Sequence, residues 1–262
     1  MKGSVYMLAE IEGKISRMGS NLSERLEDNL TGNVFGALRY IPFSIGLGEV
    51  LANSVFPRSI SDELRKINSD FWADKIEFWP YDREGELDAL IDFSTMMIGI
   101  EVKYQSGLSS DDDVVNGADD EEVQLSVNQL ARESRILARK GQGKQKLLLF
   151  IADRKACKEV YENITGRGII EQGVVFGYVS WQDILRALKQ LVLTEAYLQV
   201  IIQDLVNLLT RKGFEDFTSM EVETPAPINE HDYFKFDLKS KTDISFKTPL
   251  TISGGLYYEF SK

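Results

Sequence analysis

The spacing of apolar residues predicts a long helix ahead of the first strand. In the stretch 20–42 (SNLSERLEDNLTGNVFGALRYIP), apolar side chains recur every three to four residues, the period of a helix that packs one face against a core. Ser20 or Asn21 can cap the first turn, and Pro42 follows the end. A second amphipathic stretch spans 61–71. We therefore expect a helix before the first strand, with this amphipathic stretch between the two.

Three segments between residues 75 and 104 alternate apolar and polar side chains with a period of two, which is typical of strands. They are KIEFWP, ELDALIDF and MMIGIEVKY, and their close spacing predicts an antiparallel meander or hairpin. The run KLLLFIA at 146–152 is continuously apolar, as in a strand buried on both faces. The other expected elements are a helix over 122–140, a helix over 155–163, a strand over 173–179 and a helix opened by Ser180. A last helix is expected to be capped by Thr194, to run to Lys212 and to end at Gly213.

This order of elements predicts an α/β fold in which a mixed sheet carries helices on both faces. We expect one domain over 1–213, with its core at about 20–180 and C-terminal helices over 180–213. Residues 214–262 form a C-terminal extension with aromatic, alternating pieces (YFKF, LYYEF). The sequence leaves open whether this extension is an edge hairpin or a partly ordered tail.

Composition excludes several classes of protein. The chain has 262 residues, of which 43% are hydrophobic, so it can bury a sizeable core. A single cysteine excludes a disulfide framework, and a single histidine excludes histidine-rich metal centres. No apolar run of about 18 residues appears, so we expect a cytoplasmic protein that makes no use of a membrane. The formal net charge of −11 argues against nonspecific adhesion to nucleic acid.

The second and third predicted strands bring together charged side chains. If Ser94 and Thr95 form the two-residue turn of a hairpin, Asp88 lies opposite Glu101. The period of a strand then puts Lys103 on the same face as Glu101. Two carboxylates opposite each other lie about 5 Å apart and repel. A divalent cation between them offsets this repulsion, and carboxylate oxygens are the ligands that Mg²⁺ prefers.

A lysine beside such an ion can orient or deprotonate a bound water, so two acids and a lysine around a hard metal predict phosphodiester hydrolysis. The bare pattern Asp/Glu-x-Lys also occurs at 12–14, 153–155 and 237–239. The copy at 101–103 differs because it lies on an apolar strand with an acid on the preceding strand. The competing interpretation is a charged strand face with Glu–Lys cross-strand pairs.

Asp88 and the triplet Glu101-Val102-Lys103 resemble the core of the PD-(D/E)xK nuclease superfamily, in an uncharacterised bacterial branch. The resemblance covers about half of the chain and implies a restriction-endonuclease-like αβββαβ core. It implies that Asp88 and Glu101 hold the metal, that the main-chain carbonyl of Val102 binds it, and that Lys103 is catalytic. Leu87 stands where the named pattern has a proline.

The resemblance implies two further site residues. An acid on the first helix often completes the metal site, and Glu27 fits best because it borders the apolar stripe. A glutamine on the helix after the lysine strand recurs in some branches, and Gln129 is the closest match, with Gln124 as the alternative. Each has a simpler interpretation: Glu27 as an ordinary acid on a helix surface, and Gln129 as a polar residue facing solvent.

The implied activity is that of a Mg²⁺-dependent nuclease that cleaves DNA, with Mn²⁺ able to substitute. Nothing in the sequence separates DNA from RNA, and a role in defence against foreign DNA rests on the resemblance alone. A homodimer is expected if both strands are cut, since each chain carries one site. The alternative, from another class, is an inactive nuclease-like fold that serves as a binding or scaffolding subunit, which the acidic net charge favours.

Two charged segments have open interpretations. The acidic segment 108–122 is either a solvated linker or a loop that covers the metal site and repels DNA. The basic segment 132–158 is either a solvated helix face or a groove that follows the phosphates of a nucleic acid.

Overall fold

A mixed five-stranded sheet forms the centre of the protein. The computed structural model describes residues 22–104, 107–108, 110–112 and 126–216, and of 22–25 it describes the backbone alone. The sheet order is β1-β4-β5-β6-β7, with antiparallel pairing among β1, β4 and β5 and parallel pairing among β5, β6 and β7. The strand bounds are β1 Ile76–Phe78, β4 Ala89–Asp92, β5 Met96–Val102, β6 Gln145–Ala152 and β7 Val175–Ser180.

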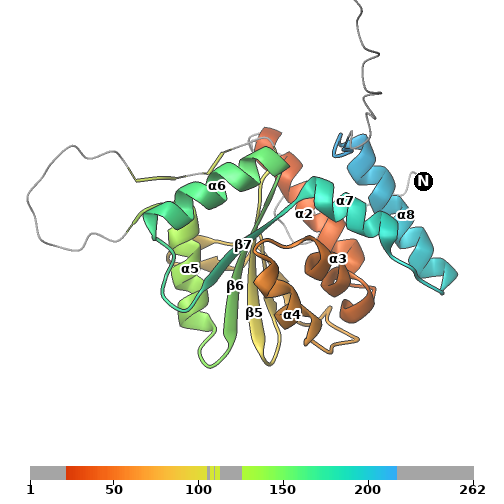
Figure 1. Cartoon of the computed structure of the whole chain (residues 1–262), viewed down its shortest axis with the longest axis horizontal. Coiled ribbons are helices and arrows are strands. Elements are labelled where there is room, and N and C mark those ends of the chain that lie inside the picture. The colour runs from red at the N-terminus through yellow and green to blue at the C-terminus, as the bar shows by residue number, and fades with distance from the viewer. Residues whose placement is uncertain (1–21, 105–106, 109, 113–125, 217–262) are drawn as a thin grey trace, which may run out of the picture. The chain divides into compact units, whose positions relative to one another are not determined.

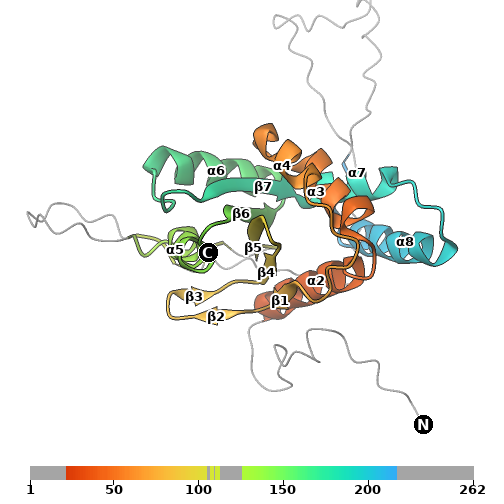
Figure 2. The ribbon, with the colours of Figure 1, turned by 90° about the horizontal axis from the view of Figure 1, so that it is seen from below.

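Helices cover both faces of this sheet, as predicted (Figures 1 and 2). One face packs against α2 (Leu22–Leu38), α3 (Leu47–Ser54), α4 (Ser61–Arg65), α7 (Trp181–Gln190) and α8 (Ala196–Arg211). The other packs against α5 (Gln129–Lys140) and α6 (Arg154–Arg167). Alternation along β5 explains the two layers, since Ile98 and Ile100 enter the first core and Met97 the second. Both faces of β6 are buried, which accounts for its continuous apolar run.

The predicted hairpin is confirmed with its register. Ser94 and Thr95 form the turn, because the backbone N–H of Phe93 donates to the carbonyl of Met96 at 2.9 Å. Farther from the turn, Ala89 pairs with Ile100. One further step of this register brings Asp88 to the level of Glu101.

Several element boundaries differ from the predictions. The amphipathic stretch 61–71 is helical only as far as Arg65, because the main chain beyond it turns to pair with Phe43, whose N–H donates to the carbonyl of Ser69 at 3.1 Å. The helix expected from 122 begins at Gln129, because the side chain of Asn128 accepts from the N–H groups of Leu130 and Ala131.

The cap predicted at Thr194 is wrong. Its hydroxyl donates to the side chain of Glu195 at 2.7 Å, and α8 begins after Glu195 without a side-chain cap. Gly213, by contrast, adopts a positive φ of 85° just past the last turn of α8, as expected for the residue that ends a helix. The helix expected over 155–163 runs longer, from Arg154 to Arg167.

Some elements were not predicted. They are α3, the short 3₁₀ turns η1 (Phe43–Ile45) and η2 (Arg58–Ile60), and a two-stranded hairpin of β2 (Tyr81–Asp82) and β3 (Gly85–Glu86) inserted between β1 and β4. The insertion explains how KIEFWP and ELDALIDF pair directly although other strands lie between them in the chain.

The packed region continues past the predicted boundary at 213. Phe214 is buried and stacks on Trp181, with ring centroids 5.6 Å apart. The residues up to Asp216 belong to one compact unit. The rest of the predicted extension, 217–262, lies outside the described residues. None of the helices in the described part is long and apolar enough to cross a bilayer.

Candidate functional site

The candidate site lies where β5 ends, at the edge of the sheet to which the carboxyl ends of the parallel strands point. Asp88 directly precedes β4, and its Oδ2 accepts a hydrogen bond from the backbone N–H of Val102 at 2.7 Å. The N–H of Trp79 donates to the main-chain carbonyl of Asp88 at 3.1 Å. Trp79 has a φ of 50°, a left-handed conformation that is uncommon for a tryptophan, at the point where the chain leaves β1. Asp88 is therefore fixed from both neighbouring strands.

Lys103 follows β5 and lies on the same face as Glu101, as predicted. Its Nζ is 2.8 Å from Oε1 of Glu101. Its main chain is held on two sides, because its N–H donates to the carbonyl of Ile151 at 2.7 Å and its carbonyl accepts from the indole of Trp181 at 3.1 Å. The lysine therefore comes from a rigid backbone segment.

Glu27 reaches the same place from α2. Its Oε1 accepts from the backbone N–H of Tyr104 at 2.9 Å, and its Oε2 lies 3.7 Å from Nζ of Lys103. The side chain is buried, so the interpretation as an ordinary helix-surface acid is wrong.

Gln129 also joins the site. It is buried at the start of α5, and its Nε2 donates to Oε1 of Glu101 at 2.6 Å. The interpretation of Gln129 as a solvent-facing residue is therefore wrong, while Gln124 lies outside the described residues. Val102 is buried at the end of β5, where its backbone N–H donates to the carboxylate of Asp88. The structure thus brings together all the side chains that were predicted for the site.

One acidic residue of the site was not predicted. Glu133 lies one helical turn after Gln129 and is 2% exposed. Its side chain contacts that of Glu101 and lowers the pKa of Glu101, against the larger upward effect of burial. Neither of its oxygens has a hydrogen-bond partner of ordinary geometry among the described residues. Its spacing from Gln129 was the available signal, since residues four apart share a face of a helix.

The clustered charges shift the ionisation of these groups. Burial, and then the charge of Glu101, raises the pKa of Asp88 well above its usual range. Burial raises the pKa of Glu101, although Lys103 opposes that shift. Burial and Glu101 also raise the pKa of Glu133 well above the usual range. Burial lowers the pKa of Lys103, but the carboxylates of Glu101 and Glu27 outweigh it, so the net shift is upward and the ammonium form is held.

These residues fit a hard divalent cation in their chemistry. The charge of Glu101 raises the pKa of the buried Asp88, and a bound cation relieves this repulsion between carboxylates. Mg²⁺ is usually bound by one or two carboxylates and keeps several waters, so this pair suffices as its protein ligands. Across the described ranges, no group of three or more acidic, histidine or cysteine side chains is arranged as a ready-made metal site.

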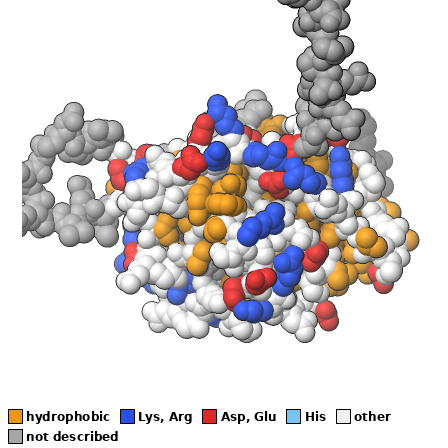
Figure 3. Space-filling view, in the orientation of Figure 1, with side chains coloured by type: hydrophobic (Ala, Val, Ile, Leu, Met, Phe, Trp, Pro, Cys, Tyr) orange, Lys and Arg blue, Asp and Glu red, His pale blue; other side chains and the backbone are white. Residues whose placement is uncertain are grey.

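Several side chains of the basic segment 132–158 form ion pairs with acids, while Lys155 and Lys158 on α6 are exposed. Its arginines on α5 hold the β2–β3 hairpin: Arg135 pairs with Glu84 at 3.0 Å, and Arg139 pairs with Asp82. Lys144 pairs with Asp92, and Arg154 lies 2.6 Å from Asp216. Figure 3 shows the same mixing on one face of the molecule, where basic side chains alternate with acidic ones.

The acidic segment 108–122 is described only at its start. Asp112 accepts from the hydroxyl of Ser126 and from the N–H of Val127, both at 2.7 Å, and Asp111 pairs with Arg167 at 2.8 Å. These contacts hold the start of the segment to Ser126 and Val127 and to α6. The remainder lies outside the described residues, so both interpretations of the segment stay predictions.

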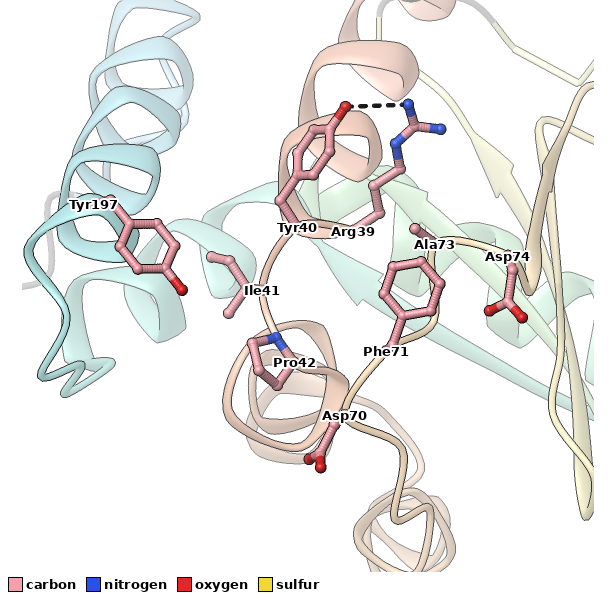
Figure 4. Close-up of a pocket in the computed structure, with 9 residues that line it drawn as sticks. All are labelled: Arg39, Tyr40, Ile41, Pro42, Asp70, Phe71, Ala73, Asp74 and Tyr197. Atoms are coloured by element: carbon pink, nitrogen blue, oxygen red, sulfur yellow. Dashed lines mark hydrogen bonds between the residues drawn. The ribbon is translucent and has the colours of Figure 1, made fainter.

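A separate cleft of about 630 Å³ lies beyond the far end of α2 (Figure 4). Its floor is Ile41 and Pro42, and three exposed aromatic residues from different segments, Tyr40, Phe71 and Tyr197, surround it. None of the carboxylates of the candidate site lines this cleft.

Comparison with known proteins adds no identification: no protein-family model, no curated protein and no solved structure matches this chain.

Proposed function

We propose that this protein is a metal-dependent nuclease that hydrolyses phosphodiester bonds. The observation that carries the proposal is the convergence of Asp88, Glu101 and Lys103 at one end of β5, with the lysine Nζ 2.8 Å from Glu101. The element order from α2 to β6, with three antiparallel strands followed by a helix and a parallel strand, supports a restriction-endonuclease-like core. Membership of the PD-(D/E)xK superfamily is part of this proposal.

In the proposed mechanism, Asp88 and Glu101 hold Mg²⁺ or Mn²⁺, with Glu27 and the carbonyl of Val102 assisting. The bound ion supplies Lewis acidity toward the phosphate and a more acidic water. Lys103 orients the attacking water and stabilises negative charge that develops on the phosphorus-centred transition state. Because its neighbours hold it as an ammonium, Lys103 acts as a donor and a charge, and the base is a different group. Gln129 holds the Glu101 carboxylate in place.

The proposed substrate is DNA, with RNA as the alternative. Helices α6 and α7 begin directly after β6 and β7 at the same edge of the sheet, and helix N-termini favour phosphate groups. The ion pairs of the basic segment limit the positive surface that could follow a long duplex. The proposal therefore places most phosphate recognition close to the metal. A cut through both strands would need two chains.

The test is cleavage of plasmid DNA and of labelled DNA and RNA oligonucleotides with Mg²⁺ or Mn²⁺. Wild-type protein should cleave with metal and stop with a chelator, while Asp88→Asn and Lys103→Met should keep their circular dichroism and lose activity. Cleavage that survives in both variants would remove the assignment.

The second candidate is an inactive fold that serves as a binding or scaffolding subunit. It is favoured by the ion pairs of Lys103 with Glu101 and Glu27, which satisfy the acids without a metal. A scaffold of this kind need show no rise in melting temperature with Mn²⁺, whereas the proposed nuclease should show one.

A further inference from the structure

Glu133 is a buried acid that the proposed mechanism leaves without a role. Its side chain is 2% exposed, and both oxygens lack a hydrogen-bond partner of ordinary geometry in the described part of the chain. It lies on α5 among residues that are apolar and fully buried, such as Ile136 and Leu137. An apolar side chain would fill the same space without burying a polar group.

The neighbours of Glu133 make its position unfavourable without a cation. Glu101 and Asp88 both act on it with like charge. A buried carboxylate is stabilised by a cation or by several hydrogen bonds, and lone buried carboxylates are rare. Gln129 supplies an amide to Glu101 and also acts on Glu133. The cation beside these acids is Lys103, which pairs with Glu101 and Glu27. Its one ammonium already interacts with three carboxylates, those of Glu27, Asp88 and Glu101, and it is not among the described groups that act most strongly on Glu133.

The orientation of Glu133 follows from its helix. Gln129, one turn earlier on the same face of α5, already reaches Oε1 of Glu101 at 2.6 Å. Glu133 therefore reaches Glu101 from α5, while Asp88 lies beside β4, the hairpin partner of β5. The unpartnered oxygens thus belong to the same small volume as the predicted metal ligands.

We propose that Glu133 is a third carboxylate of the cation site, binding the divalent ion directly or through one of its waters. This inference rests on the proposed function, because it concerns the same ion. It adds a ligand from α5 to ligands that come from the β4–β5 hairpin. Occupation of the site by a hard divalent cation such as Mg²⁺ or Mn²⁺ then gives the orphan oxygens of Glu133 their partner.

The experiment measures Mn²⁺ binding to the full chain by calorimetry, with the electron paramagnetic resonance signal of free Mn²⁺ as a second readout. The variants are Glu133→Gln, which keeps volume and removes the charge, and Glu133→Leu, which removes all polarity. The matched control is Asp28→Asn, since Asp28 is another buried acid whose charge acts on Asp88. Folding of each variant is checked by circular dichroism.

The proposal predicts that both Glu133 variants weaken Mn²⁺ binding by about 10-fold or more, while Asp28→Asn weakens it by less than about threefold. Without metal, Glu133→Gln should melt no lower than wild type, because it replaces a carboxyl group whose ionisation is opposed by burial and by Glu101. Mn²⁺ affinity of Glu133→Gln within about threefold of wild type would overturn the inference, as would an equal loss in Asp28→Asn. Those results leave the proposed nuclease intact, whereas absence of Mn²⁺ binding by wild type would overturn both.

Discussion

The side-chain amide of Gln129 lies 2.6 Å from Oε1 of Glu101, so helix α5 holds the carboxylate of the strand that also carries Lys103. Lys103 approaches the same oxygen at 2.8 Å. One carboxylate oxygen thus connects a helix on one face of the sheet to the end of its central strand. The position of α5 determines how this acid is presented.

Removing the Gln129 amide should loosen Glu101. We expect Gln129→Leu to lower the free energy of unfolding by about 1–3 kcal/mol, because a buried carboxylate loses a hydrogen bond. Urea denaturation measures this effect. The control is Gln145→Leu, which removes a similar bond to Glu63 at an exposed position and should change stability by less than about 0.5 kcal/mol. Equal losses of stability in the two variants would contradict the claim that the hydrogen bond from Gln129 to the buried Glu101 stabilises the fold more than an exposed one.

The raised pKa values make the metal-free protein sensitive to pH. Asp88 and Glu133 hold protons in the folded state more tightly than in the unfolded chain. Their contribution to stability is therefore fully present below the ordinary carboxylate pKa of about 4 and is lost as pH rises through the folded values. In chelator, the stability of wild type relative to Asp88→Asn should fall from pH 4 to about pH 8.

The variant comparison is needed because other acids act in the opposite direction. The pKa of Asp216, for example, is lowered by its hydrogen bond to Arg154, so its contribution grows with pH. Differences between wild type and Asp88→Asn cancel such contributions. A difference that rises with pH would show that Asp88 is not held in a protonated form.

Close packing at Gly99 fixes the height of α5 above β5. A Cβ at Gly99 would lie 2.9 Å from a methyl group of Leu137, which is fully buried. We expect Gly99→Ala to lower the free energy of unfolding by about 1–3 kcal/mol through overpacking. Gly107→Ala, where nothing lies within 4 Å, is the matched control and should be close to neutral. The double variant Gly99→Ala/Leu137→Val should recover part of the loss.

The contact of α5 with the β2–β3 hairpin should be stronger than an ordinary surface ion pair. Arg135 reaches Oε2 of Glu84 through Nε at 3.2 Å and through its terminal nitrogen at 3.0 Å, with both side chains mostly buried. We expect Arg135→Ala to lower the free energy of unfolding by about 1–2 kcal/mol. Lys155→Ala breaks an exposed pair with Glu159 and should change it by less than about 0.5 kcal/mol. Equal losses would argue against a structural role for the hairpin contact.

Most of the site could be predicted from the sequence, because its charged side chains come from two strands that are adjacent in the chain and joined by a short turn. The two-residue turn at Ser94-Thr95 is enough to set the register of β4 and β5, which places Asp88 near Glu101 and puts Lys103 on the same face. The helical period is enough to predict α2, and the continuous apolar run is enough to predict the strand β6. Glu27 and Gln129 were chosen by resemblance, and their contacts depend on how α2 and α5 pack.

Features that depend on long-range packing could not be derived in this way. Glu133 has an ordinary helical spacing, and its importance comes from burial against Glu101, which the sequence does not express. The β2–β3 hairpin is too short for a periodic signal, and its stability comes from arginines of α5 more than forty residues away in the chain. Because these arginines are paired with acids of the hairpin, the role of the basic segment could not be predicted from its charge alone.

The most direct measurement is anomalous diffraction from crystals of the full chain soaked in Mn²⁺. We expect a peak between the carboxylates of Asp88 and Glu101, with Lys103 displaced from Oε1 of Glu101 or turned toward a metal-bound water. Saturating Mn²⁺ that leaves no peak there, with Lys103 Nζ still paired to Glu101, would contradict the proposal.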